Sequence, residues 1–195
     1  MTASLDVITK RIYQVLAYGS FAVIVAVLGY AAFSIITQDP SVVGATLVNV
    51  EFPPPSISPI YMKPITYLYF ASLVFMYTAL ELNKERIRKL PDSAISLVKL
   101  AAFVLAATFF FELAYNLVFW GGQIAYQSII GHLNPDAVIN SFPNPKTPWN
   151  VVFASKLWTV FLITGTYVFY YMTRVESYRT NQALRQAVAS KPPQA

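Results

Sequence analysis

The stretch AISLVKLAAFVLAATFFFELAYNLVFW, residues 94–120, is almost entirely apolar and carries only two charged residues, Lys99 and Glu112. A helix that crosses a bilayer needs about 20 mostly apolar residues. The stretch therefore predicts a transmembrane helix, and it places the carboxylate of Glu112 inside the membrane.

Three further apolar runs have the length of a membrane span. We predict spans at about residues 12–36, 65–82, 95–120 and 151–173. The whole chain of 195 residues is 56% hydrophobic and 12% charged, whereas soluble domains carry about 25% charged residues. These features predict an all-α integral membrane protein in which residues 1–195 form a single membrane domain with four transmembrane helices.

Basic residues predict the orientation of these spans, because Lys and Arg concentrate on the cytoplasmic side. Of the 14 Lys and Arg residues, 11 fall on the side of the two termini, and only Lys63, Lys146 and Lys156 fall toward the other side. We therefore expect a multi-pass protein of a prokaryotic plasma membrane with both termini in the cytoplasm. The cytoplasmic parts are then the loop 83–94 and the tail 174–195.

The predicted outer loops, residues 37–64 and 121–150, are rich in proline, with EFPPPSISPIYMKP at 51–64 and FPNPKTPW at 142–149. Proline at this density excludes regular helix. The loops either cap the helices or dock a partner.

The third apolar segment, residues 94–130, would be about 55 Å long as one helix, so we expect the span to end at Gly121-Gly122. Residues 123–130 then form an outer extension or an interfacial helix, and one continuous helix is the alternative.

Polar residues follow one stripe of the third helix: Thr108, Glu112, Tyr115, Asn116, Phe119 and Gln123. Glu112 lies eight residues before Trp120, about 12 Å along the helix, and Lys156 lies seven residues after Trp149, about 10 Å. If both tryptophans mark the outer interface, the two charges lie at similar depth, and we predict an ion pair between them. The alternatives are a proton or cation site, or a polar contact with a partner subunit.

Small residues share one face of the first helix: Gly19, Ala22, Ala26 and Gly29. Such residues let membrane helices approach closely. We predict a helix-packing face, used within this chain or against another subunit. Ala102 and Ala106 of the third helix are expected to pack in the same way.

The sequence lacks the residues and motifs that several kinds of site require. The chain has no cysteine and one histidine, His132, and its sequence has no HExxH motif, P-loop or GxGxxG motif. The net charge of +5 is explained by membrane topology, so we expect no nucleic-acid partner. We expect no catalytic residue, cofactor or metal on this chain.

The sequence therefore favours a non-catalytic accessory subunit of a multisubunit membrane complex, in respiratory or other redox or energy metabolism, such as an oxidase or monooxygenase assembly. The expected partners are other integral membrane subunits, and anionic lipids at cytoplasmic basic clusters such as NKERIRKLPD, residues 83–92. The alternatives are a small homo-oligomeric channel or transporter that uses Glu112, and a lipid-handling membrane enzyme.

Overall fold

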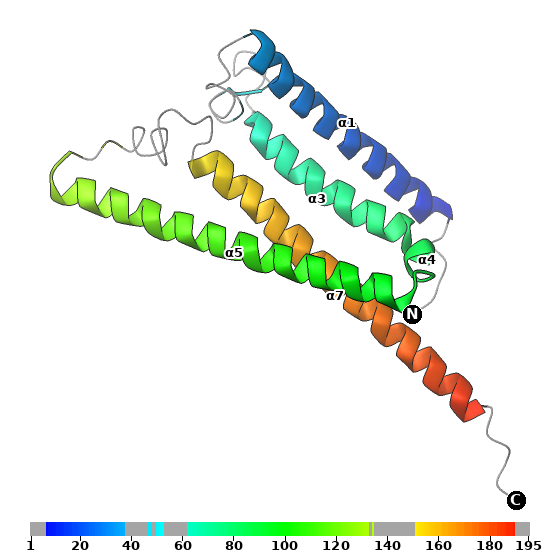
Figure 1. The fold of residues 1–195 in the computed structure, drawn as a ribbon. Helices are drawn as coiled ribbons and strands as arrows, with labels where there is room; N and C mark the ends of the chain where they lie inside the picture. Colours follow the sequence, from blue (N-terminus) through cyan, green and yellow to red (C-terminus); the bar gives the residue numbers. More distant parts are fainter. Residues whose placement is uncertain are drawn as a thin grey trace, which may run out of the picture.

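The computed structural model describes residues 7–37, 47, 50–52, 62–132, 134 and 151–189 (Figure 1). Over these residues the chain is helical, with α1 (Val7–Thr37), α3 (Pro64–Leu82), α4 (Lys84–Ile87), α5 (Asp92–Ile129) and α7 (Val151–Ala189). The extended backbone in the same residues forms one isolated antiparallel bridge, between Phe52 and Met62. The prediction of an all-helical protein is confirmed for the described part of the chain.

Three of these helices, α1, α3 and α5, are long and apolar enough to cross a membrane. They agree with the prediction of an integral membrane protein. α7 is the most polar of the four long helices and is not one of the three, so the fourth span stays a prediction. Most of the predicted proline-rich loops lies outside the described residues.

The helix starts follow the local sequence. Pro64 occupies the first turn of α3, where its missing N–H removes no helical hydrogen bond. α5 begins after Pro91, whose backbone is extended, and Asp92 in its first turn faces the positive end of the helix dipole. Pro91 and Asp92 therefore account for the position at which α5 begins.

Two helices extend beyond the predicted ends of their spans. α5 continues through Gly121 and Gly122 to Ile129, so the alternative of one continuous helix holds. The helix stops at Gly131, which adopts a positive φ of 71°, while the N–H of His132 donates to the carbonyl of Gln127. This bond and the left-handed glycine form a Schellman-type end, whereas a glycine pair only weakens a helix. Likewise, α7 continues from the predicted end of its span at residue 173 to Ala189, so most of the predicted tail is helix.

The long helices stand in a row rather than in a closed bundle. The main helix–helix contacts among the described residues are α1 with α3, α3 with α7 and α7 with α5. Figure 1 shows α5 crossing α7, so that the far end of α5 diverges from the start of α7. The end of the row that holds α4 is called here the α4 end. The two edge helices, α1 and α5, each pack mainly on one neighbour.

Buried side chains form two separate clusters along this row. One joins α1 to α3 through Ala31, Leu47 and Ile65. The other lies at the α4 end, where Ile95 of α5 packs on Tyr171, Met172 and Val175 of α7. The second cluster holds the ends of α3, α5 and α7 together and so supports the pocket described below.

Close helix packing occurs where α7 crosses α5. A Cβ atom added to Gly165 would lie 2.9 Å from the carbonyl oxygen of Ala102 and 3.2 Å from the Cβ of Ala106. The predicted packing of Ala102 and Ala106 is therefore confirmed, with Gly165 as the partner that was not predicted.

The predicted small face of α1 is largely exposed in the described part of the chain. The buried residues of α1 are Ala17, Ser20, Ala31 and Ser34, on the face toward α3. The four predicted residues, Gly19, Ala22, Ala26 and Gly29, are exposed, and Ala26 borders a cavity that Pro64 and Tyr67 of α3 also line. A Cβ atom on either glycine would meet nothing within 4 Å. Both alternatives for this face, packing within this chain and packing against another subunit, therefore stay predictions.

Candidate functional site

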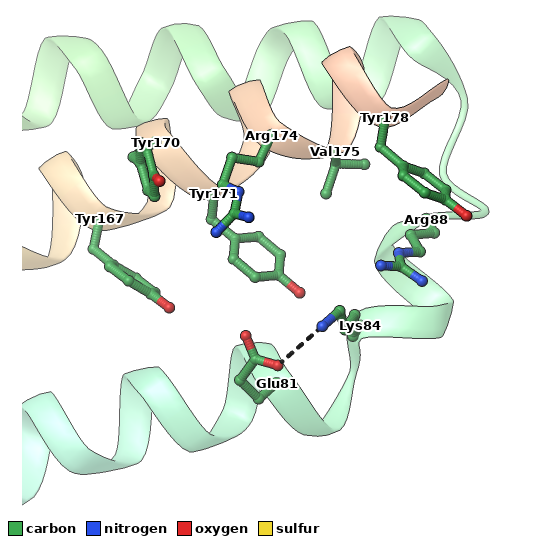
Figure 2. Close-up of a pocket in the computed structure, with 9 residues that line it drawn as sticks. All are labelled: Glu81, Lys84, Arg88, Tyr167, Tyr170, Tyr171, Arg174, Val175 and Tyr178. Atoms are coloured by element: carbon green, nitrogen blue, oxygen red, sulfur yellow. Dashed lines mark hydrogen bonds and ion pairs between the residues drawn. The ribbon is translucent and has the colours of Figure 1, made fainter. Parts of the chain in front are cut away.

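A cavity of about 370 Å³ opens at the α4 end, between α7 on one side and α3 with α4 on the other (Figure 2). Its walls are four tyrosines, three basic residues, one acidic residue and one valine. They are Glu81, Lys84, Arg88, Tyr167, Tyr170, Tyr171, Arg174, Val175 and Tyr178. This set is called here the tyrosine–arginine pocket.

Two helical stripes build the pocket. On α7, the spacing of four, three and four residues through Tyr167, Tyr171, Arg174 and Tyr178 puts these side chains on one face. On the opposite wall, Glu81, Lys84 and Arg88 follow a spacing of three and four. Figure 2 shows the two stripes facing each other across the cavity.

The pocket carries an excess of positive charge. Its one carboxylate, Glu81, accepts an ion pair from Lys84 at 3.4 Å, and the side chain of Glu81 is only 14% exposed. The ion pairs of the described residues include neither Arg88 nor Arg174. With three basic residues against one acidic residue, the lining has a formal charge of +2.

Both arginines rest on aromatic rings. The guanidinium carbon of Arg88 lies 4.7 Å from the centre of the Tyr178 ring, and that of Arg174 lies 5.7 Å from the centre of the Tyr170 ring. A guanidinium over a ring face gains cation–π attraction and keeps its N–H groups at its edge for other acceptors. The rings therefore position the two cations without neutralising them.

The walls of the pocket are tied together by a second arginine site. Arg179 of α7 donates to the carboxylate of Asp92 at 2.6 Å, and its other terminal nitrogen donates to the carbonyls of Arg88 and Leu90. Lys99 and Glu176 form a further ion pair between α5 and α7. These contacts hold α7 against the connection from α4 to α5.

The predicted polar stripe of α5 lies along one flank of the α5–α7 contact. Asn116 is buried and donates to the carbonyl of Glu112 at 2.8 Å, within its own helix. Glu112 and Gln123 are half-buried, and Thr108 is exposed. The stripe is therefore partly open on the side away from α7.

The predicted ion pair between Glu112 and Lys156 is not among the ion pairs of the described residues. The Nζ atom of Lys156 instead donates to the hydroxyl of Thr66 on α3, at 2.9 Å. The reason is the order of the row, since α7 lies between α3 and α5 and turns Lys156 toward α3. The depth of Lys156 and Glu112 in the membrane was estimated from the sequence, but the direction in which each side chain points from its helix axis was not.

The carboxylate of Glu112 has no hydrogen-bond or ion-pair partner among the described residues. The rings of Phe109 on α5 and Phe161 on α7 stack with their centres 4.7 Å apart, about one helical turn before Glu112. The carboxylate of Glu112 therefore lies close to the aromatic contact between α5 and α7 but takes no part in it.

No metal site is found in the part of the chain that the structure describes. Its residues contain no group of three or more His, Cys, Asp or Glu side chains that could hold a metal ion. His132 lies just beyond the end of α5. The chain matches no known protein family, no curated protein and no solved structure.

The tyrosine–arginine pocket was missed by sequence reasoning, although a signal for it exists. The repeat of Tyr and Arg at helical spacing between residues 167 and 178 marks one face of α7. The spacing does not identify the opposite wall of the pocket, because its residues lie about 90 positions earlier in the chain.

Proposed function

We propose that this protein is a non-catalytic accessory subunit of a multisubunit membrane complex, with its open row of helices packed against other integral membrane subunits. The observation that carries the proposal is the carboxylate of Glu112, which lies within a helix able to span a membrane and is paired by no described residue. A charge left in lipid is costly, so such residues face protein or water. A neighbouring subunit would supply the missing partner.

The edge helix α1 supports the same proposal. Gly19 and Gly29 are exposed, and a Cβ atom on either would meet nothing within 4 Å. Small residues on a membrane helix allow a second helix to approach closely. The row would then have contacts to other subunits at both edges, through α1 and through α5.

The proposal keeps four spans, both termini in the cytoplasm of a prokaryotic cell and a plasma-membrane location, with α7 as the fourth span. The α4 end is then cytoplasmic. Support comes from the basic residues, because Lys84, Arg88, Arg174 and Arg179 all gather at this end. A place in redox or energy metabolism is part of the proposal and rests on the general role of small membrane subunits without cofactor ligands.

The test is purification from its native membrane in a mild detergent, followed by native mass spectrometry. Copurification with unlike chains at a fixed stoichiometry is the expected result. A homogeneous assembly of this chain alone would overturn the proposal and favour a small channel or transporter that uses Glu112.

A pair of variants tests the contact at Glu112. Glu112→Gln removes the charge but keeps the shape, and we expect it to weaken association with the partner by about 30-fold or more, since breaking a buried charge pair costs about 2–5 kcal/mol. Glu85→Gln makes the same change on an exposed residue of α4 and should leave the assembly intact. Equal retention of partners by both variants would remove Glu112 from the interface.

A further inference from the structure

We propose that the tyrosine–arginine pocket binds the phosphate group of an anionic phospholipid headgroup. The first support is charge. Arg88 and Arg174 enter the same cavity from opposite walls, and the ion pairs of the described residues use neither of them. Lys84 is already matched by Glu81 at 3.4 Å. The two arginines are therefore the cations available to a bound anion.

The second support is the chemistry of these two cations. A guanidinium donates two parallel N–H bonds to a phosphate, a geometry that an ammonium group does not offer. Stacking on Tyr178 and Tyr170, at 4.7 Å and 5.7 Å, limits the motion of each guanidinium plane. Less conformational entropy is then lost when the phosphate binds.

The third support is the size of the cavity. Its volume of about 370 Å³ lies at the lower end of the range of about 300–1,000 Å³ for small-molecule sites. This space accommodates a headgroup with its phosphate but not the acyl chains. The rest of the lipid would have to lie outside the pocket, against the helices.

The fourth support is the position of the pocket at the end of a candidate span. Glu81 is the penultimate residue of α3, so the cavity opens where that helix ends. Tyrosine is enriched at the level of the headgroups. From the pocket, ring contacts continue across the row of helices, from Tyr171 and Tyr167 of α7 to Tyr77 of α3 and Tyr13 of α1, with ring centres 6.2, 5.7 and 6.0 Å apart. Tyrosines at one level of three helices place the cavity at the depth of lipid headgroups, a position that a soluble phosphate would not need.

The experiment uses the full chain, purified in a neutral detergent, and measures binding of dioctanoyl phosphatidylglycerol by native mass spectrometry and by the shift in melting temperature. Dioctanoyl phosphatidylcholine and inorganic phosphate are the comparison probes. We expect saturable binding of phosphatidylglycerol and at least tenfold weaker binding of both comparison probes. Equal binding of the two lipids would overturn the requirement for an anionic headgroup. If inorganic phosphate bound more tightly than phosphatidylglycerol, the proposal of a lipid ligand would be wrong, and the pocket would be assigned to a soluble phosphate.

Variants locate the binding in the pocket. Arg88→Gln and Arg174→Gln should each weaken phosphatidylglycerol binding about tenfold, the loss expected for one charged hydrogen-bond donor. Arg88→Lys should recover only part of the loss, because it restores the charge without the planar fork. Arg86→Gln is the matched control, since Arg86 is exposed on the same short helix and does not line the pocket.

The control also separates a pocket from diffuse attraction. If Arg86→Gln weakened binding as much as the pocket variants, the binding would be general attraction to a basic surface, and the proposal would fail. Unchanged binding in Arg174→Gln would contradict it as well. Arg174 is exposed, so this variant is expected to fold and its result is decisive.

Discussion

The crossing of α7 over α5 yields the sharpest prediction, because it depends on one glycine. A Cβ atom on Gly165 would lie 2.9 Å from the carbonyl oxygen of Ala102 and 3.0 Å from the backbone nitrogen of Ala106. Real Cβ atoms essentially never approach closer than 3.0 Å to such atoms. Both neighbours are backbone atoms, so no change of rotamer relieves the overlap. Gly165→Ala should therefore force the two helices apart by a few tenths of an ångström.

The magnitude follows from two opposing terms. Overpacking of this kind costs about 1–3 kcal/mol, whereas replacing glycine by alanine inside a helix contributes about 1 kcal/mol of stability. Gly122→Ala on α5 supplies the second term alone, because nothing lies within 4 Å of its added Cβ. The propensity term cancels between the two variants, so Gly165→Ala should be less stable than Gly122→Ala by about 1–3 kcal/mol.

The assay is thermal unfolding of each variant in the same detergent, followed by circular dichroism. For a chain of this size the difference corresponds to about 2–12 °C in Tm, and Gly165→Leu should lower the Tm further. Equal shifts for Gly165→Ala and Gly122→Ala would refute the reasoning, since they would mean that α5 and α7 do not approach closely at this point.

Two further predictions concern polar contacts. Lys156→Met and Thr66→Val should couple in a double-mutant cycle of unfolding free energy by about 0.5–1.5 kcal/mol, since their side chains share a hydrogen bond of 2.9 Å. A larger coupling of Lys156→Met with Glu112→Gln would instead restore the ion pair predicted from sequence. Arg179→Gln should lower the Tm clearly more than Asp92→Asn, because Arg179 also donates to two backbone carbonyls while the side chain of Asp92 is 92% exposed and an exposed ion pair contributes about 0–1 kcal/mol. Equal decreases in Tm for the two variants would mean that Arg179 stabilises the protein only through its ion pair with Asp92.

Sequence reasoning succeeded where the signal is local. Runs of apolar residues predicted the long helices. It failed where the signal depends on what surrounds a residue. The stop of α5 at Gly131, beyond Gly121-Gly122, was not predicted, and the end of the span itself stays a prediction.

The candidate site shows the same division. Helical spacing correctly grouped Glu112 and Asn116 on one stripe, but the partner of Lys156 was wrong because its direction around α7 was unknown. Spacing also identified small residues on α1 without showing that the space around Gly19 and Gly29 is open in the described part of the chain. The tyrosine–arginine pocket was not predicted at all, since its two walls meet only after folding.

The sequence by itself determined that the chain is helical, apolar and without cysteine, and it set the face of each helix on which polar, small and aromatic residues lie. These properties follow from the residues within one or a few turns of each other. Only the tertiary structure decided the order α1–α3–α7–α5, and with it the crossing at Gly165, the bond from Lys156 to Thr66 and the joining of Arg88 with Arg174 in one cavity. The physical reason is that neighbouring membrane helices are selected by packing and polar contacts around the whole circumference of each helix, and a linear pattern carries no information about which of these faces meet.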